Sequence, residues 1–179
     1  MTIYIGLLRG INVGGNHKIK MAELKACLEA IGLRRVQTYI QSGNLVFESE
    51  EAEKELRRKM ERELERRFGF PVPVMLRTAG ELAGVAARNP YSPDELEEGW
   101  SVHVLFFAEP IAPEQIAALP ETDIAPDEFR AYGREIYQLY RRRMSDSKLP
   151  VMLGKLKGGT DRNWNTVAKL LEMAAAEQR

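Results

Sequence analysis

LLRGINVGGNHKIKM, residues Leu7–Met21, joins a short apolar segment to a helical pattern through a loop rich in glycine, asparagine and lysine. Apolar residues alternate over Ile3–Leu8, which predicts a strand, and recur at helical spacing over Met21–Ile31, which predicts a helix. A loop of this composition between a strand and a helix can aim backbone N–H groups and cations at an anion. The stretch therefore indicates the first strand–helix connection and a candidate binding edge.

The rest of the first half continues with a hairpin, a long helix, a strand and a short helix. The hairpin turns at Gln41–Asn44, where glycine and asparagine tolerate positive φ. Thr78 and Glu81 have the spacing of a capping box, which marks the start of the short helix. We expect the strands at 36–40, 45–48 and 72–77 and the helices at 50–68 and 78–89. The order β-α-β-β-α-β is the ferredoxin-like pattern.

A polar, turn-rich segment at 90–100 predicts a linker between residues 1–89 and a second unit at 101–179. We expect its strands at 102–107, 128–132 and 135–140, and its helices at 113–119 and 164–176. The sequence shows no convincing fourth strand, and Val151–Leu153 is the one candidate. The predicted fold class is α+β, with two ferredoxin-like units that have antiparallel sheets, the second one degenerate.

The ferredoxin-like order makes a geometric prediction about the binding edge. In a sheet with strand order 4-1-3-2, the first and second strands point the same way, so the segments that follow them lie at one edge. We therefore expect Arg9–Lys20 to lie near the hairpin turn at Gln41–Asn44. The exit from the long helix, Gly69–Pro73, is expected at this edge too.

Two glycine-rich segments supply the candidate ligand residues. Glycines let a backbone approach a phosphate closely, and arginine and lysine supply charge. A structural alternative stays open, because an irregular connection also needs glycine, and Asn163 and Trp164 could cap a helix and anchor a core. The first segment is not a Walker A loop, because G-x-x-x-x-G-K-[ST] does not occur in it. The candidates are Arg9, Gly10, Asn12, Gly14, Gly15, Lys18, Ser42, Gly43, Asn44, Arg162, Asn163 and Trp164.

Three segments carry a family resemblance: IGLLRGINVGGNHKIKMAELK from Ile5, the QSGNLVF hairpin from Gln41, and TDRNWNTVAKL from Thr160. Together they resemble an uncharacterised bacterial family, the domain of unknown function sixteen-ninety-seven. The resemblance implies an α+β fold of two related units. It implies no activity, cofactor or catalytic residue, and it adds weight to nine of the candidates as characteristic positions without giving them roles.

Charge is unevenly distributed although the chain has no net charge. Residues 1–45 hold 6 basic and 2 acidic side chains, and residues 130–169 hold 10 basic and 3 acidic, whereas residues 81–129 hold 1 basic and 11 acidic. The two basic blocks make nucleic-acid binding an alternative function. It is not favoured, because zero net charge opposes it and because Asn44 and Val46 stand where an RNA-recognition strand carries aromatic residues. Tyr4, which matches the first-strand aromatic of such domains, is expected to be buried.

Other functional classes leave little trace in the sequence. One cysteine, Cys27, excludes an internal disulfide and, with only His17 and His103, a zinc cluster, so no metal site is expected. No catalytic constellation is complete, so enzymatic activity is uncertain and the cofactor unknown. No apolar run approaches the roughly 20 residues of a membrane helix, and the chain opens with a strand rather than a signal peptide. We expect a cytoplasmic protein that binds an anionic or phosphate-bearing small molecule; a protein-interaction or oligomerisation module is the third alternative, and the oligomeric state is open.

Overall fold

The computed structural model describes every residue, Met1–Arg179, as two compact units. The first unit comprises Met1–Gly84 together with Ala168–Arg179, and the second comprises Val85–Val167. The end of the last helix therefore groups with the first unit, whereas the sequence placed all of 101–179 in the second. No helix in either unit is both long and apolar enough to cross a membrane.

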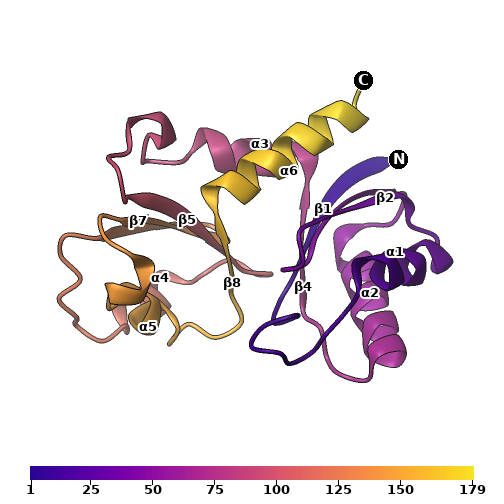
Figure 1. Cartoon of the computed structure of the whole chain (residues 1–179), viewed down its shortest axis with the longest axis horizontal. Helices are drawn as coiled ribbons and strands as arrows, with labels where there is room; N and C mark the ends of the chain where they lie inside the picture. The colour runs from indigo at the N-terminus through magenta and orange to yellow at the C-terminus, as the bar shows by residue number, and fades with distance from the viewer. The chain divides into compact units, whose positions relative to one another are not determined.

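The first unit follows the ferredoxin-like order (Figure 1). Its sheet has the strand order β2-β3-β1-β4 with antiparallel pairing throughout, as predicted. The Thr78–Glu81 capping box is confirmed by two reciprocal hydrogen bonds, of 2.8 and 3.1 Å. The elements are β1 Thr2–Leu8, α1 Met21–Ala30, β2 Arg34–Tyr39, β3 Asn44–Ser49, α2 Glu53–Phe68, β4 Val74–Thr78 and α3 Ala79–Ala87, whose last three residues fall in the second unit.

Helices α1 and α2 cover one face of this sheet and form its core (Figure 1). The buried stripe of α2, Leu56, Met60 and Leu64, is fully inaccessible. Full burial of each such side chain contributes roughly 1.5–3 kcal/mol. Because α2 is otherwise strongly charged, this stripe orients it and determines which of its side chains stay in water.

The edge strand β2 is secured by the C-terminal helix α6, Trp164–Glu177. Gln37 Nε2 donates to Glu177 Oε1 at 2.5 Å, and Arg35 Nε lies 3.0 Å from Glu177 Oε2. Arg35 sits at an irregularity in the β2–β3 pairing, where its φ is 53°. A bulge and paired charges both discourage another strand from adding to this edge.

The second unit repeats the same topology, with sheet order β6-β7-β5-β8. Helix α5 and the segments near it pack on the sheet face that carries Ile136 and Tyr140. The 90–100 segment contains one turn of 3₁₀ helix, η1 Pro93–Glu95. The remaining elements are β5 Ser101–Phe106, α4 Pro113–Ala117, β6 Glu128–Tyr132, β7 Glu135–Tyr140, η2 Met144–Asp146, α5 Leu149–Leu153 and β8 Thr160–Asn163.

The second sheet is complete, which corrects the expected degenerate form. The candidate fourth strand at Val151–Leu153 is wrong, because those residues belong to helix α5, which starts with Pro150 in its first turn. The fourth strand is β8, which pairs antiparallel with β5. Gly159, directly before β8, allows this strand to lie close to its neighbours, because a Cβ at this position would lie 2.8 Å from the ring of Phe107.

Candidate functional site

The segments predicted to meet at one edge of the first sheet do meet there. Leu8 N donates to Gly43 O at 2.9 Å, which joins the end of β1 to the β2–β3 hairpin. Arg9 N donates to Pro73 O at 3.0 Å, which brings the segment after α2 to the same place. The predicted convergence of Arg9–Lys20, the hairpin and the α2 exit is therefore confirmed.

The glycine-rich loop is a miniature hairpin. Asn16 N donates to Val13 O at 3.0 Å, and Asn12 N donates to His17 O at 3.0 Å. Between them Gly14 and Gly15 have φ of 59° and 78°. Positive φ at both central residues is the geometry of a type I′ turn, which favours glycine. The turn alone thus accounts for the paired glycines.

Asn12 connects this miniature hairpin to its surroundings. Its Nδ2 donates to Ile19 O at 3.1 Å and to Gln41 O at 2.7 Å, and its Oδ1 accepts from Ile19 N at 2.9 Å. Asn12 has a φ of 54°, a conformation that asparagine tolerates better than most residues. Both polar atoms of the Asn12 amide therefore have partners within the protein, and this amide holds the loop against the hairpin.

Asn44 has a similar role in the β2–β3 hairpin. It is fully buried, and its Nδ2 donates to Tyr39 O and to Ser42 Oγ, both at 2.9 Å. Gly43, with φ of 93°, packs so closely that a Cβ would lie 2.8 Å from Leu8 Cβ. These two candidates therefore shape the edge, and Ser42 is the exposed member of the three.

The side chain of His17 packs against Phe70 at this edge of the first sheet. Its ring stacks on Phe70, with centroids 4.2 Å apart and planes inclined by 8°. Phe70 lies between α2 and β4, so the stack joins the loop to the α2 exit. An exposed histidine in this place supports the loop by packing.

A hollow of about 290 Å³ lies at the junction of the loop and the hairpin. Lys18 and Lys20 are exposed there, and α1 begins at the next residue with no side chain capping its N-terminus. Arg9 and Gly10, at the start of the same loop directly after β1, are exposed as well. Three of the lining residues, Ile19, Lys20 and Gln41, were absent from the candidates chosen by sequence, although all three fall in the expected segments. The lining comprises Asn12, Gly15, Lys18, Ile19, Lys20 and Gln41.

The three late candidates belong to the second unit and have local structural roles. Arg162 is buried in β8, and its Nη1 donates to Thr160 Oγ1 and to Asp161 O, both at 2.8 Å. Burial lowers the pKa of Arg162 to about 10. Asn163 Oδ1 accepts from Thr166 N at 2.9 Å and so caps α6, and the half-buried Trp164 is the first residue of that helix. The structural alternative for Asn163 is thus confirmed.

A polar network around His103 was missed by sequence analysis. His103 Nδ1 lies 2.6 Å from Asp161 Oδ2, and Asp161 Oδ1 accepts from Gln138 Nε2 at 2.8 Å. Gln138 Oε1 in turn accepts from the hydroxyl of Tyr140, whose pKa is raised by burial. His103 is half-buried on β5, within the strand expected at 102–107. Its partner was hidden because β8 was not recognised.

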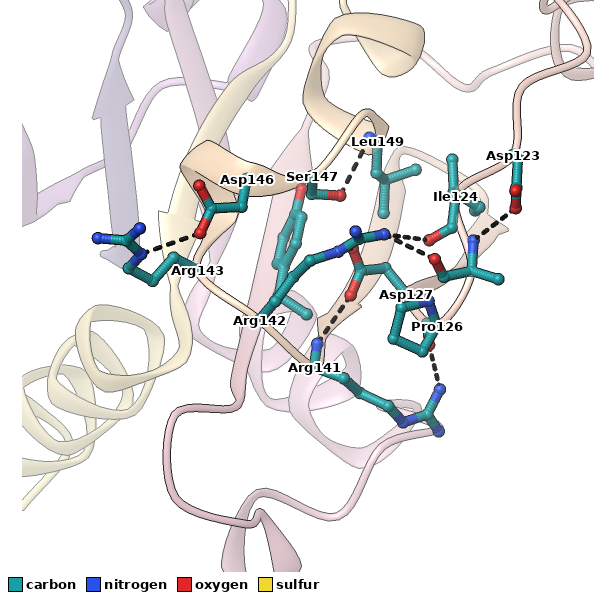
Figure 2. A network of polar contacts seen from close by, with 12 residues as sticks. Asp123, Ile124, Pro126, Asp127, Arg141, Arg142, Arg143, Asp146, Ser147 and Leu149 are labelled. Carbon is teal, nitrogen blue, oxygen red and sulfur yellow. Dashed lines mark hydrogen bonds and ion pairs between the residues drawn. The ribbon is translucent and has the colours of Figure 1, made fainter.

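Each arginine of the triplet Arg141–Arg143 has a protein partner, and two of them, Arg141 and Arg142, hold the segment before β6 (Figure 2). Arg142 Nε lies 3.0 Å from Oδ2 of the buried Asp127, and its Nη2 donates to the carbonyls of Ile124 and Ala125. Arg141 forms an ion pair with Glu128 at 2.5 Å, and Arg143 with Asp146 at 3.0 Å. All three guanidinium groups have protein partners, which disfavours the triplet as a phosphate site.

Tyr4 is buried, as expected. Its ring stacks on Phe47 with centroids 5.8 Å apart, and its hydroxyl donates to Glu51 O at 2.8 Å. The face of β1 that would carry a base-stacking platform is instead the face covered by α1 and α2. The Tyr4 ring is therefore not available for stacking on a base.

Comparison with known proteins agrees with this architecture. The model of the DUF1697 family, described as a protein of unknown function, matches residues 1–137. The chain belongs to this family. It is also similar to the solved structure of a conserved bacterial protein from Streptococcus pneumoniae, with a TM-score of 0.78 and 28% sequence identity over 97% of this chain and 98% of that one. A search of curated proteins found no significant match.

Proposed function

We propose that the protein binds an anionic, phosphate-bearing small molecule at the hollow beside the loop after β1. The observation that carries this proposal is the hollow of about 290 Å³ with Lys18 and Lys20 in its lining. A pocket lined by two exposed lysines favours an anionic ligand, because each ammonium group attracts negative charge at short range.

The other features of the hollow suit the same ligand. Gly15 leaves its part of the lining without a side chain, and a Cβ there would meet nothing within 4 Å. A ligand oxygen can therefore approach the backbone closely. Since no side chain caps the N-terminus of α1, its first N–H groups and the helix dipole add to the attraction. In this proposal Lys18 and Lys20 bind the negatively charged phosphate. Asn12 and Asn44 hold the loop and the β2–β3 hairpin in place through their hydrogen bonds.

The direct test is isothermal titration of the full chain with pyrophosphate at low salt. The double variant Lys18→Gln/Lys20→Gln removes the two charges, and we expect its affinity to fall by at least roughly tenfold, or about 1.4 kcal/mol. Lys54→Gln is the matched control, because Lys54 is an exposed lysine of α2 that does not line the hollow. Equal affinity in all three proteins, or no binding by the wild type, would refute the proposal.

A short oligonucleotide provides the arm for the nucleic-acid alternative. If it binds with an affinity that falls steeply as salt rises, while pyrophosphate does not bind, the basic blocks rather than the hollow carry the function.

We further propose that the protein acts in the bacterial cytoplasm. The lone, buried Cys27 suits a reducing compartment, and the similar solved structure is bacterial.

A further inference from the structure

Ile40, at the tip of the β2–β3 hairpin, has an unusual backbone conformation. Its φ is 48°, in the left-handed region. A β-branched residue is a genuine outlier there, because its Cβ crowds the following carbonyl oxygen. The nearby positive-φ positions are Gly14, Gly15, Gly43, Asn12 and His17, and none of these residues is β-branched. Ile40 is therefore strained where a smaller residue would relax.

Neighbouring hydrogen bonds impose this conformation. Tyr39 O accepts from Asn44 Nδ2 on one side of Ile40, and Gln41 O accepts from Asn12 Nδ2 on the other. The backbone on both sides is thus held by buried or half-buried amides. Strain that persists because its surroundings determine it is typical of ligand-binding segments.

Packing within the protein does not compensate for the strain. The Ile40 side chain is 50% exposed, so it gains only part of the stabilisation of a core residue. Val13, in the miniature hairpin, is 64% exposed. The 2.7 Å hydrogen bond between Asn12 and Gln41 joins the residues next to Val13 and Ile40. Val13 and Ile40 are thus exposed aliphatic residues that directly follow or precede in the chain two residues lining the hollow, Asn12 and Gln41.

We infer that Ile40 and Val13 form an apolar surface for a ligand whose phosphate is held by Lys18 and Lys20. This surface contacts the part of the ligand that is not phosphate. The ligand class is then a phosphate or diphosphate attached to an apolar or aromatic group, rather than a bare inorganic anion. This inference rests on the proposed function and adds to it a specificity-determining residue, Ile40. Nucleotides and prenyl-type diphosphates share this chemistry.

The test compares three diphosphates that differ only in their body: pyrophosphate, adenosine diphosphate and geranyl diphosphate. We expect the wild type to bind at least one of the substituted diphosphates roughly tenfold more tightly than pyrophosphate. Preference for the adenosine compound identifies a nucleotide site, and preference for the geranyl compound identifies a prenyl-type site.

Two substitutions assign the preference to Ile40. Ile40→Asn tolerates the left-handed backbone but removes the apolar surface, so we expect a higher melting temperature, unchanged pyrophosphate affinity and loss of most of the tenfold preference. Ile40→Leu retains an apolar side chain and should retain the preference. If wild type binds the three diphosphates equally, or if Ile40→Asn keeps the preference, this inference is wrong while the anion site stands. If none of the three binds, the proposed function fails as well.

Discussion

Arg77 and Arg162 hold equivalent places in the two units. Each lies on the last strand of its sheet, is buried, and donates from Nη1 to the carbonyl oxygen of the preceding residue at 2.8 Å. In each unit the next residue, Thr78 or Asn163, accepts a hydrogen bond from the first turn of the helix that follows. The units are thus structural repeats, although their sequences share little here beyond an arginine followed by a cap.

The equivalence predicts matched effects at the two caps. Thr78→Ala and Asn163→Ala each remove an acceptor from the first turn of α3 or α6, so each should lower the free energy of unfolding by about 1 kcal/mol. Urea unfolding monitored by circular dichroism measures the change. Asn165→Ala is the control, because Asn165 is exposed within α6 and should have little effect. A loss at one cap only would contradict the equivalence.

Asp127 should make stability depend on pH. Burial raises the pKa of its carboxyl, but hydrogen bonds from Ser147, from Arg141 N and from Arg142 outweigh burial and hold it below its ordinary 3.8. Because the folded-state pKa is depressed, the stabilisation is fully present above pH 3.8 and is lost as pH falls through the lower folded value.

Asp127→Asn should therefore lower the free energy of unfolding by about 2 kcal/mol at pH 7, with a smaller difference from wild type below pH 3. Denaturant titrations across pH 2–7 would test this expectation. Asp146→Asn is the control, since Asp146 pairs with Arg143 at an exposed site and should show a far smaller effect. A difference that stays constant down to the lowest pH would argue against the depressed pKa.

Two glycines at the binding edge should respond differently to alanine. Gly15→Ala introduces only the left-handed penalty of about 1 kcal/mol, because nothing lies within 4 Å of its Cβ. Gly43→Ala adds contacts at 2.8 Å to Leu8 and 2.9 Å to Ile11, and should lower stability by about 3 kcal/mol or more. Thermal unfolding of the pair separates backbone strain from overpacking; similar losses would show that the edge yields at Gly43.

Asn12 should be the most sensitive polar side chain of the loop. Asn12→Ala removes three hydrogen bonds and places alanine at a φ of 54°, so we expect a loss of about 2–3 kcal/mol in the free energy of unfolding. Asn16→Ala is the comparison, because Asn16 is exposed in the same hairpin and should lose less than about 0.5 kcal/mol. Equal sensitivity would show that the Asn12 amide contributes little to holding the loop.

The first unit was predictable because its local signals agree with one another. Alternating strands, the stripe of α2 and the turn at Gly43 all indicate the same topology, and that topology brings Arg9–Lys20 to the hairpin. Strand β8 was not predictable, because the sequence TDRN is polar and its strand form depends on pairing with β5. The roles of the ligand candidates were harder still to predict. The amide of an asparagine such as Asn12 can hydrogen-bond either to a ligand or to the protein backbone, and sequence spacing does not distinguish these two roles.

The contact of Glu177 with β2 has a consequence for the order of synthesis. Gln37 and its partner Glu177 are separated by 140 residues. At about 5–20 residues per second, a ribosome adds that length in roughly 7–28 seconds. During this interval the nascent β2 edge lacks its C-terminal partner. The first unit, although most of it is synthesised first, is therefore complete only when the last residues of the chain have been added. A truncated product that lacks the final turns would leave this edge open to other nascent chains.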